Sequence, residues 1–301
     1  MSTSLDDVDR LDEVDGLAEG GRSGASRPGR TSGVRRPRYR RVDPVPWWLV
    51  TIGVLVALYF ILPTLVVIPL SFSSSAAFEF PPKELSFRWY ENFFTNKAWI
   101  GSLGNSLLVA VLAAAIATVV GTAAAIGLNN LAGRFAAFLR TLLMVSMVTP
   151  AIVIAVAVYI SFLQWHLTGT VLGYVLAHAA LGVPFVLVSV SSALGGFDKR
   201  LLRASASLGA TPFRSFLRVT LPLISRGIVT GAIFAFVTSF DEVVIALFLR
   251  SPTFQTLPVQ MYNSVTFELD PTISASSSLV VVAVTVILLV PLLLGTRKKS
   301  R

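Results

Sequence analysis

The sequence contains no cysteine and only 2 histidines. A chain without cysteine forms no disulfide, holds no iron–sulfur cluster and uses no thiol in redox chemistry. Neither His166 nor His178 has a partner at the spacing of a metal site, so we expect no metal site and assign both to packing or hydrogen bonding. A nucleophile–base pair of the kind an intramembrane enzyme needs is also missing from the pattern, which argues against catalysis by this chain.

Charged residues are scarce as well, at 14%, whereas hydrophobic residues make up 54%. A soluble domain of this length could not bury so much apolar surface. Six apolar stretches are long enough for the roughly 20 residues that cross a bilayer. Because lone strands cannot satisfy their backbone in lipid, the pattern predicts an all-α polytopic membrane protein with six transmembrane helices. The expected spans are Trp47–Leu70, Ser102–Leu128, Leu139–Leu163, Val171–Leu194, Ile224–Leu249 and Ile273–Leu294.

Basic loops alternate with neutral or acidic loops along the chain. Arginines gather before the first span, after the second span, in the loop 197–222 and in the tail 297–301, whereas the other three loops are neutral, balanced or acidic. Cytoplasmic loops carry the excess of lysine and arginine, so both termini are predicted to lie in the cytoplasm. The same bias accounts for the net charge of +9, and we therefore expect no nucleic-acid partner.

Three regions follow from this pattern. Residues 1–42 form an N-terminal extension, acidic at first and then rich in glycine, serine and arginine. Such a composition cannot bury a core, so we expect a disordered cytoplasmic segment whose basic half contacts anionic membrane lipid. The membrane domain covers residues 43–296, and a basic cytoplasmic tail covers 297–301.

The loop 197–222 is long for a membrane protein and has the signals of two short helices. Asp198 suits the cap of the first helix, and Gly209 suits the left-handed position that ends it. A capping hydroxyl at Thr211, followed by Pro212, restarts the helix. The pattern alone leaves two interpretations open, an interfacial hairpin on lipid headgroups or a plug that fits a groove on a cytoplasmic ATPase.

This loop resembles the EAA loop of binding-protein-dependent ABC import permeases, whose pattern is E-A-A, three residues, G, nine residues, I-x-L-P. Arg203-Ala204-Ser205 takes the E-A-A place, Gly209 follows after three residues, and Leu221-Pro222 closes the pattern. Within the E-A-A place two positions depart from the pattern, because the leading Glu is Arg203 and the second Ala is Ser205. Pro222 is expected to end the second short helix before the next span.

The resemblance extends over 47–294, where later stretches look like the second permease subunit of spermidine/putrescine importers. It implies a type I ABC import permease fold in the plasma membrane, a second permease subunit, two ATPase subunits and an extracytoplasmic substrate-binding protein. ATP and Mg²⁺ would be bound by the ATPase subunits and no cofactor by this chain, which has no Gly-x₄-Gly-Lys-Ser/Thr motif. The residues implied in coupling are Arg203, Ala204, Ser205, Gly209, Leu221 and Pro222. A permease for another small solute, such as an amino-acid-like compound, an opine or iron, remains open.

The pair Asp241-Glu242 falls inside the fifth predicted span. Charges in lipid cost several kcal/mol, so both side chains should face protein or water. Neighbouring residues on a helix point about 100° apart, and the pattern does not rank the two. One interpretation places them on the pathway of a cationic solute, with Phe240 and Thr238 as lesser candidates. Another pairs them with donors on neighbouring helices, and a third makes one of them the proton site of a secondary transporter.

Smaller signals complete the prediction. Gly231, Ala235 and Ser239 recur at every fourth position, as in close helix packing. Pro150 is expected to kink its span. The run 256–258, Thr-Leu-Pro, is expected to begin a further short helix beyond the fifth span.

Overall fold

The computed structural model describes residues 46–76, 79–198 and 200–297, without the side chains of 268 and 287–297. This part of the chain is helical, and its only β pairing is one antiparallel bridge between Ser73 and Leu85. The all-α prediction is therefore confirmed for the described residues. The chain divides into a unit Met1–Val50, of which the start of the first helix is described, and a unit Thr51–Arg301. The predicted N-terminal extension, 1–42, lies outside the described residues.

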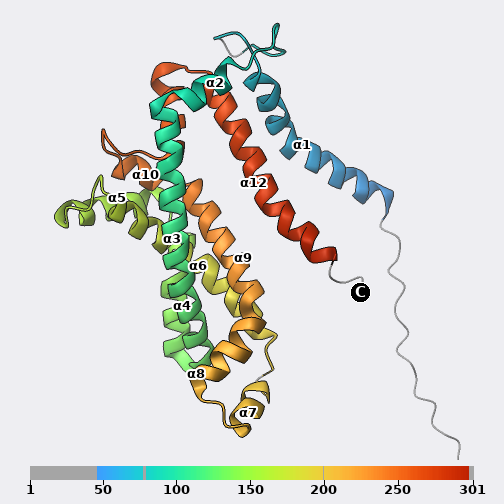
Figure 1. Ribbon diagram of the computed structural model, residues 1–301, viewed down its shortest axis with the longest axis vertical. Helices are drawn as coiled ribbons and strands as arrows, with labels where there is room; N and C mark the ends of the chain where they lie inside the picture. Colours follow the sequence, from blue (N-terminus) through green and yellow to red (C-terminus); the bar gives the residue numbers. More distant parts are fainter. Residues whose placement is uncertain (1–45, 77–78, 199, 298–301) are drawn as a thin grey trace, which may run out of the picture. The chain divides into compact units, whose positions relative to one another are not determined.

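Twelve α-helices and two π-helical turns follow one another in the described residues (Figure 1). They are α1 (Trp47–Ser71), α2 (Arg88–Thr95), α3 (Lys97–Asn130), α4 (Gly133–Val148), α5 (Ala151–Gln164), α6 (Val171–Gly195), α7 (Arg200–Ser207), α8 (Pro212–Ser215), η1 (Phe216–Thr220), α9 (Leu221–Phe240), α10 (Val244–Leu249), α11 (Leu257–Asn263), η2 (Ser264–Glu268) and α12 (Thr272–Arg297).

Four helical runs in the described residues are long and apolar enough to cross a membrane. These runs are α1, α3, α6 and the continuous stretch Pro212–Phe240, and the bent pair α4–α5 would make a fifth. The apolar part of α12, Thr272–Val286, is shorter. The sequence pattern therefore located the apolar helices, but two of its six spans are not single helices.

The third predicted span, Leu139–Leu163, is wrong as a continuous helix. Helices α4 and α5 meet at an angle of 103°, and the break lies at Thr149-Pro150. Proline forces the residue before it out of the helical region, and Thr149 is extended, with φ −72° and ψ 134°. The kink expected at Pro150 is thus a break of the helix with a bend of 103°.

The fifth predicted span, Ile224–Leu249, is also wrong at both ends. Its helix starts earlier, because α8, η1 and α9 continue into one another, and Pro222 does not end it. In the π-helical turn η1 the Leu221 N–H donates to the carbonyl of Phe216, five residues back. Pro222 follows this π-helical turn directly, and the helix continues past the proline into α9. At the other end, α9 stops at Phe240 and α10 begins at Val244.

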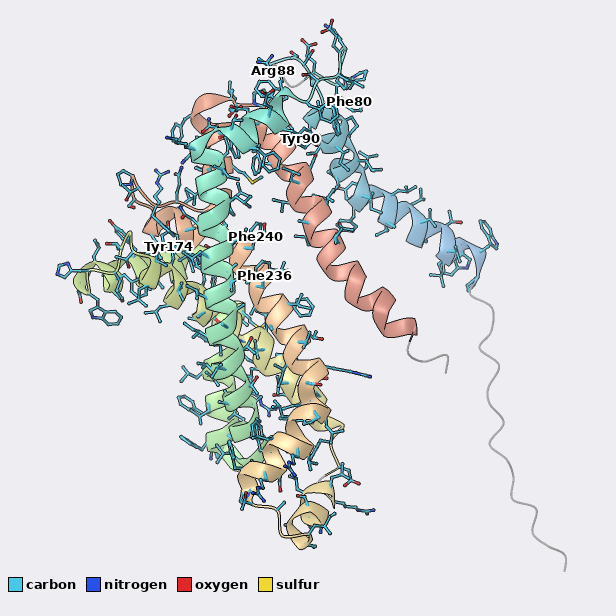
Figure 2. The ribbon with its side chains drawn as sticks, in the orientation of Figure 1. Phe80, Arg88, Tyr90, Tyr174, Phe236 and Phe240 are labelled. Atoms are coloured by element: carbon cyan, nitrogen blue, oxygen red, sulfur yellow. The ribbon has the colours of Figure 1, made fainter. Side chains whose placement is uncertain are left out.

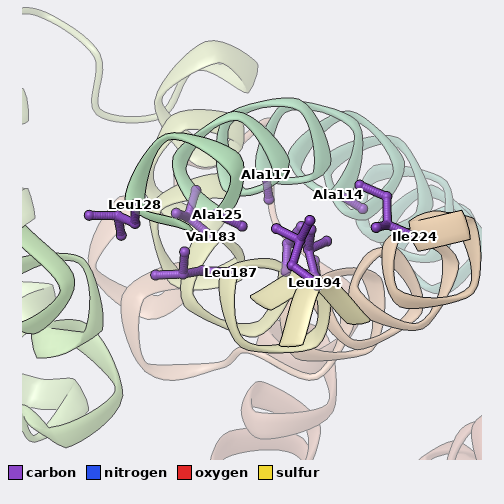
Figure 3. Packing of buried hydrophobic residues seen from close by; sticks show 11 residues of the cluster. Ala114, Ala117, Ala125, Leu128, Val183, Leu187, Leu194 and Ile224 are labelled. Atoms are coloured by element: carbon purple, nitrogen blue, oxygen red, sulfur yellow. The ribbon is translucent and has the colours of Figure 1, made fainter. Parts of the chain in front are cut away.

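The centre of the second unit is a tight packing of α3, α6 and α9 through small residues (Figure 3). Ala117 of α3 and Ala235 of α9 are both buried, and Gly182 of α6 lies between them. A Cβ atom added at Gly182 would lie 3.0 Å from the Cβ of each alanine. The helices approach this closely because small side chains let their backbones meet. Gly231 and Ser239 are buried on the same face of α9 as Ala235, which confirms the predicted packing series.

The closeness of α9 to α6 makes Gly231 a sensitive position. A Cβ atom there would lie 2.8 Å from the Cα of Val186, so Gly231→Ala should lower the free energy of unfolding by about 1–3 kcal/mol through overpacking. Gly104→Ala is the matched control, because nothing lies within 4 Å of its added Cβ and alanine favours a helix. Thermal unfolding of the detergent-purified protein measures both. Equal melting temperatures would contradict the close approach of these helices.

Candidate functional site

The break between α9 and α10 is held by the side chain of Glu242. Its Oε1 accepts a hydrogen bond from the Ile245 N–H at 3.0 Å, and its Oε2 accepts one from the Ala246 N–H at 3.0 Å. The first N–H groups of any helix lack partners within that helix, and in lipid no water replaces them. Ile245 and Ala246 are both buried, so the Glu242 carboxylate satisfies donors that would otherwise be unpaired.

Two side chains of α6 hold the break from the other side. The Nδ1 atom of His178 lies 2.9 Å from Ser239 Oγ and 3.1 Å from the Ser239 carbonyl oxygen. One turn earlier, the Tyr174 hydroxyl donates to the carbonyl of Ala246 at 3.1 Å. These bonds confirm the predicted hydrogen-bonding role of His178. In the described part of the chain no three histidine or acidic residues are grouped so that they could hold a metal ion.

Asp241 lies apart from this buried cluster. Its side chain is exposed, and it lines a pocket of 530 Å³ formed by the helix break, α11, η2 and α12. Among the described side chains that line the pocket, Asp241 supplies the one carboxylate, whereas most of the wall is apolar or aromatic. The lining residues are Phe240, Asp241, Val243, Leu257, Pro258, Met261, Tyr262, Val265, Thr266, Ile273, Ser277, Val280 and Val281.

The structure therefore separates the candidate pathway residues. Phe240 joins Asp241 at the pocket, where its ring stacks on that of Phe236 with 5.9 Å between centroids (Figure 2). Glu242 and Thr238 are not part of the pocket wall. The two neighbouring carboxylates, which the sequence pattern did not rank, thus have different surroundings, one open and one committed to backbone donors.

Sequence reasoning missed the opposite wall of this pocket. Met261, Tyr262 and Thr266 come from α11 and η2, and Ser277 comes from α12. The one available signal was the Thr-Leu-Pro run, which correctly predicted the start of α11 at Leu257. It indicated a helix there, but only the folded chain brings that helix over Asp241.

The loop 197–222 has the corner that its sequence predicts. The Asp198 Oδ1 atom accepts from the Arg200 N–H at 2.8 Å, and α7 follows. Gly209 has φ +79°, which is the left-handed conformation expected of it. The Thr211 hydroxyl accepts from the Arg214 N–H at 3.4 Å as α8 begins. The two short helices of this corner are therefore capped as predicted.

A direct contact joins the two arms of this corner. Ser205 Oγ of α7 and Ser215 Oγ of α8 lie 2.8 Å apart, within hydrogen-bond distance. Of the other residues implied in coupling, Leu221 is half-buried, and four are exposed: Arg203, Ala204, Gly209 and Pro222.

Large apolar side chains project from the same corner. Leu208 is 88% exposed and Phe213 is 71% exposed. Exposed apolar groups clustered in this way mark contact surfaces. The arginines of α7, α8 and η1 form no ion pair with any described residue, which leaves their charges available to a partner or to lipid. The corner lies at the end of α6 and the start of α9 (Figure 1).

Similarity to known proteins shows the family of this chain. Residues 117–297 match the family described as the binding-protein-dependent transport system inner membrane component. The chain belongs to this family. It is 31% identical over 227 residues to the spermidine/putrescine transport system permease protein PotC of Escherichia coli K12, covering 74% of this chain and 84% of PotC. It is 32% identical over 210 residues to the putrescine transport system permease protein PotI of the same strain, covering 67% and 74%.

A solved structure supports the same fold. The chain resembles a subunit of a bacterial ABC transporter involved in the import of the acidic polysaccharide alginate, with a TM-score of 0.65 and 13% sequence identity. The match covers 85% of this chain and 96% of the other. This chain is thus a multi-pass inner-membrane permease subunit of an ABC importer. Its relatives are transport components rather than enzymes.

The different surroundings of the two carboxylates predict different effects on stability. Glu242→Ala removes the acceptor of two buried N–H groups, so we expect the free energy of unfolding to fall by about 1–3 kcal/mol. Asp241→Ala, its neighbour in the pocket, should change stability by no more than about 0.5 kcal/mol. Thermal unfolding in detergent compares the two variants. An equal loss in both would mean that Glu242 is not the residue that holds the break.

Proposed function

We propose that this permease subunit transports polyamines, such as spermidine and putrescine. The observation that carries the proposal is the position of Asp241, an exposed carboxylate in a pocket whose wall includes the rings of Phe240 and Tyr262. A polyamine joins ammonium groups by short methylene chains. The carboxylate attracts the ammonium, the rings add cation–π attraction, and the apolar wall accepts the methylenes. The names of the PotC and PotI relatives support the same solute class.

The subunit would form half of the solute pathway, with a second permease subunit as the other half. An extracytoplasmic binding protein would deliver the solute to the face that carries α2 and α11. The distribution of arginine and lysine supports cytoplasmic termini, and the apolar stretches support six membrane crossings, with the bent pair α4–α5 as one of them.

The corner of the loop 197–222 would dock on an ATPase subunit on the cytoplasmic side. Exposed Leu208 and Phe213 would enter an apolar groove, and Arg203, Ala204 and Ser205 would lie along its edge. Gly209, Leu221 and Pro222 would set the shape of the corner and its join to α9. ATP and Mg²⁺ are bound by the ATPase subunits in this proposal. Closure of those subunits would move the corner and, through the continuous helix from Pro212 to Phe240, the edge of the Asp241 pocket.

Removal of the pocket charge should reduce transport. Asp241→Asn is expected to lower the initial rate of labelled spermidine uptake by at least about ten-fold, because the ammonium loses its counter-charge at the pocket. The assembled complex should be recovered in unchanged amount. Glu79→Gln is the matched control, since it removes an exposed carboxylate that pairs with Lys83 and does not line the pocket.

Three results, from the variant, from deletion of the chain and from inactivation of the ATPase, would count against the proposal. Full uptake by Asp241→Asn would remove the pocket from the pathway. Unchanged spermidine uptake after deletion of the chain, in cells without another polyamine importer, would exclude polyamines as the solute. Uptake that survives ATPase inactivation but collapses with the proton gradient would point to proton coupling.

The left-handed glycine of the corner gives a separate test of docking. Gly209→Val should abolish solute-stimulated ATP hydrolysis by the reconstituted complex, because a β-branched residue resists φ +79° and no neighbouring atom offers a compensating contact. Gly209→Asn should keep most of the activity, since asparagine accepts this conformation. Both variants should insert normally. Normal stimulation in Gly209→Val would show that the shape of the corner does not matter for coupling.

A further inference from the structure

His178 has an unusual combination of burial and incomplete bonding. The residue is 1% exposed, and its Nε2 atom has no hydrogen-bond partner among the described residues. That atom faces the Glu242 carboxylate, with 3.9 Å between Nε2 and Oε2, which is beyond hydrogen-bond range. An aliphatic side chain would avoid placing a buried polar atom there without a partner. The imidazole ring thus lies between Ser239 at the end of α9 and Glu242 before the start of α10.

The other ring nitrogen is anchored to the end of α9 in either tautomer. Ser239 offers both a carbonyl oxygen and a hydroxyl to Nδ1. A protonated Nδ1 donates to the carbonyl, and an unprotonated Nδ1 accepts from the hydroxyl. In the second case Nε2 carries the proton and its N–H faces the carboxylate of Glu242, an attractive arrangement. The imidazole thus connects the last turn of α9 to the carboxylate that begins α10.

The helix that carries His178 is well suited to act as a fixed support. Its neighbours Tyr174, Ala177 and Ala179 on α6 are buried, and α6 packs along both α3 and α9. Asp241 follows Ser239 by two residues, so any movement of the anchored turn moves the pocket carboxylate as well.

We propose that His178 is a positioning residue for the Asp241 pocket. It does not touch the pocket itself, since it is not part of the wall. It fixes the end of α9 against the start of α10, and so determines where Asp241 and Val243 project. Its effect on transport rests on the proposed function, whereas its effect on the geometry of the break does not.

The absence of cysteine from the chain permits a direct test of this geometry. Val243→Cys places the one thiol of this chain on the pocket wall, and the rate at which a small cationic methanethiosulfonate labels this chain can be measured in the purified importer complex. We expect His178→Ala to change this rate by at least about three-fold, because the break opens or shifts once the ring is removed. An unchanged rate in the His178→Ala background would overturn the proposal.

Two controls separate positioning from general loosening. Leu208→Cys, at the exposed corner, should label at the same rate with and without His178→Ala. Val186→Ala removes buried packing from the same helix, away from the break, and should leave the labelling of Val243→Cys unchanged. If Val186→Ala changes that rate as much as His178→Ala does, the effect of His178 is packing alone and the proposal is wrong.

A conservative variant provides the rescue. In His178→Asn the side-chain amide should take the place of Nδ1 and keep a bond to Ser239. The labelling rate of Val243→Cys should therefore return at least halfway to its value with His178 present. Spermidine uptake, if it falls in His178→Ala, should recover in His178→Asn. No rescue of labelling by asparagine would contradict the anchoring role. If His178→Ala fails to accumulate, Ser239→Ala tests the same contact, because it removes the hydroxyl that an unprotonated Nδ1 accepts from, and it should change the labelling rate of Val243→Cys. An unchanged rate in Ser239→Ala would then contradict the anchoring role. If Asp241→Asn leaves uptake intact while His178→Ala alters labelling, the proposed function fails and the positioning role stands.

Discussion

The organisation of this permease depends on how the helical stretch is interrupted between α9 and α10. Each backbone N–H and carbonyl in lipid needs a partner, so a break is stable only where side chains replace the lost bonds. Glu242 does this at the start of α10 by accepting from two buried N–H groups. Because Glu242 is committed to the backbone, its neighbour Asp241 is free to face the pocket. Glu242 stabilises the break, and Asp241 places a carboxylate at the pocket beside it.

The close packing of α3, α6 and α9 holds the helices on both sides of His178 and Ser239 in place. Alanine and glycine at the crossing points bring the helices together so closely that added methyl groups would collide. Such packing does not deform continuously, so a displacement at one end of α9 is transmitted along it rather than absorbed. The corner of the loop 197–222 lies at the start of this helical run and the Asp241 pocket lies at its end. A single helix therefore connects the proposed docking surface to the proposed solute site.

Much of this arrangement was predictable from residue type and spacing. The apolar stretches located the helices, and the cap residues Asp198 and Thr211 located α7 and α8. Gly209 was correctly assigned a positive φ because few other residues adopt one. The family resemblance also followed from the loop pattern. These features are local, since a cap, a turn or an apolar run depends on residues close together in the chain.

Two features close together in the chain were nevertheless predicted wrongly. Pro222 was expected to end a helix, but the π-helical turn η1 directly before it lets the helix continue. The span containing Asp241-Glu242 was expected to be continuous, because an apolar run does not show that the Glu242 carboxylate replaces helical bonds at Ile245 and Ala246. From the sequence one could therefore read which stretches are apolar helices, where the loop turns and that two neighbouring carboxylates follow an apolar stretch. Which of the two carboxylates is open follows only from the folded chain, because the choice depends on His178 of α6 on one side and on α11 and α12 on the other.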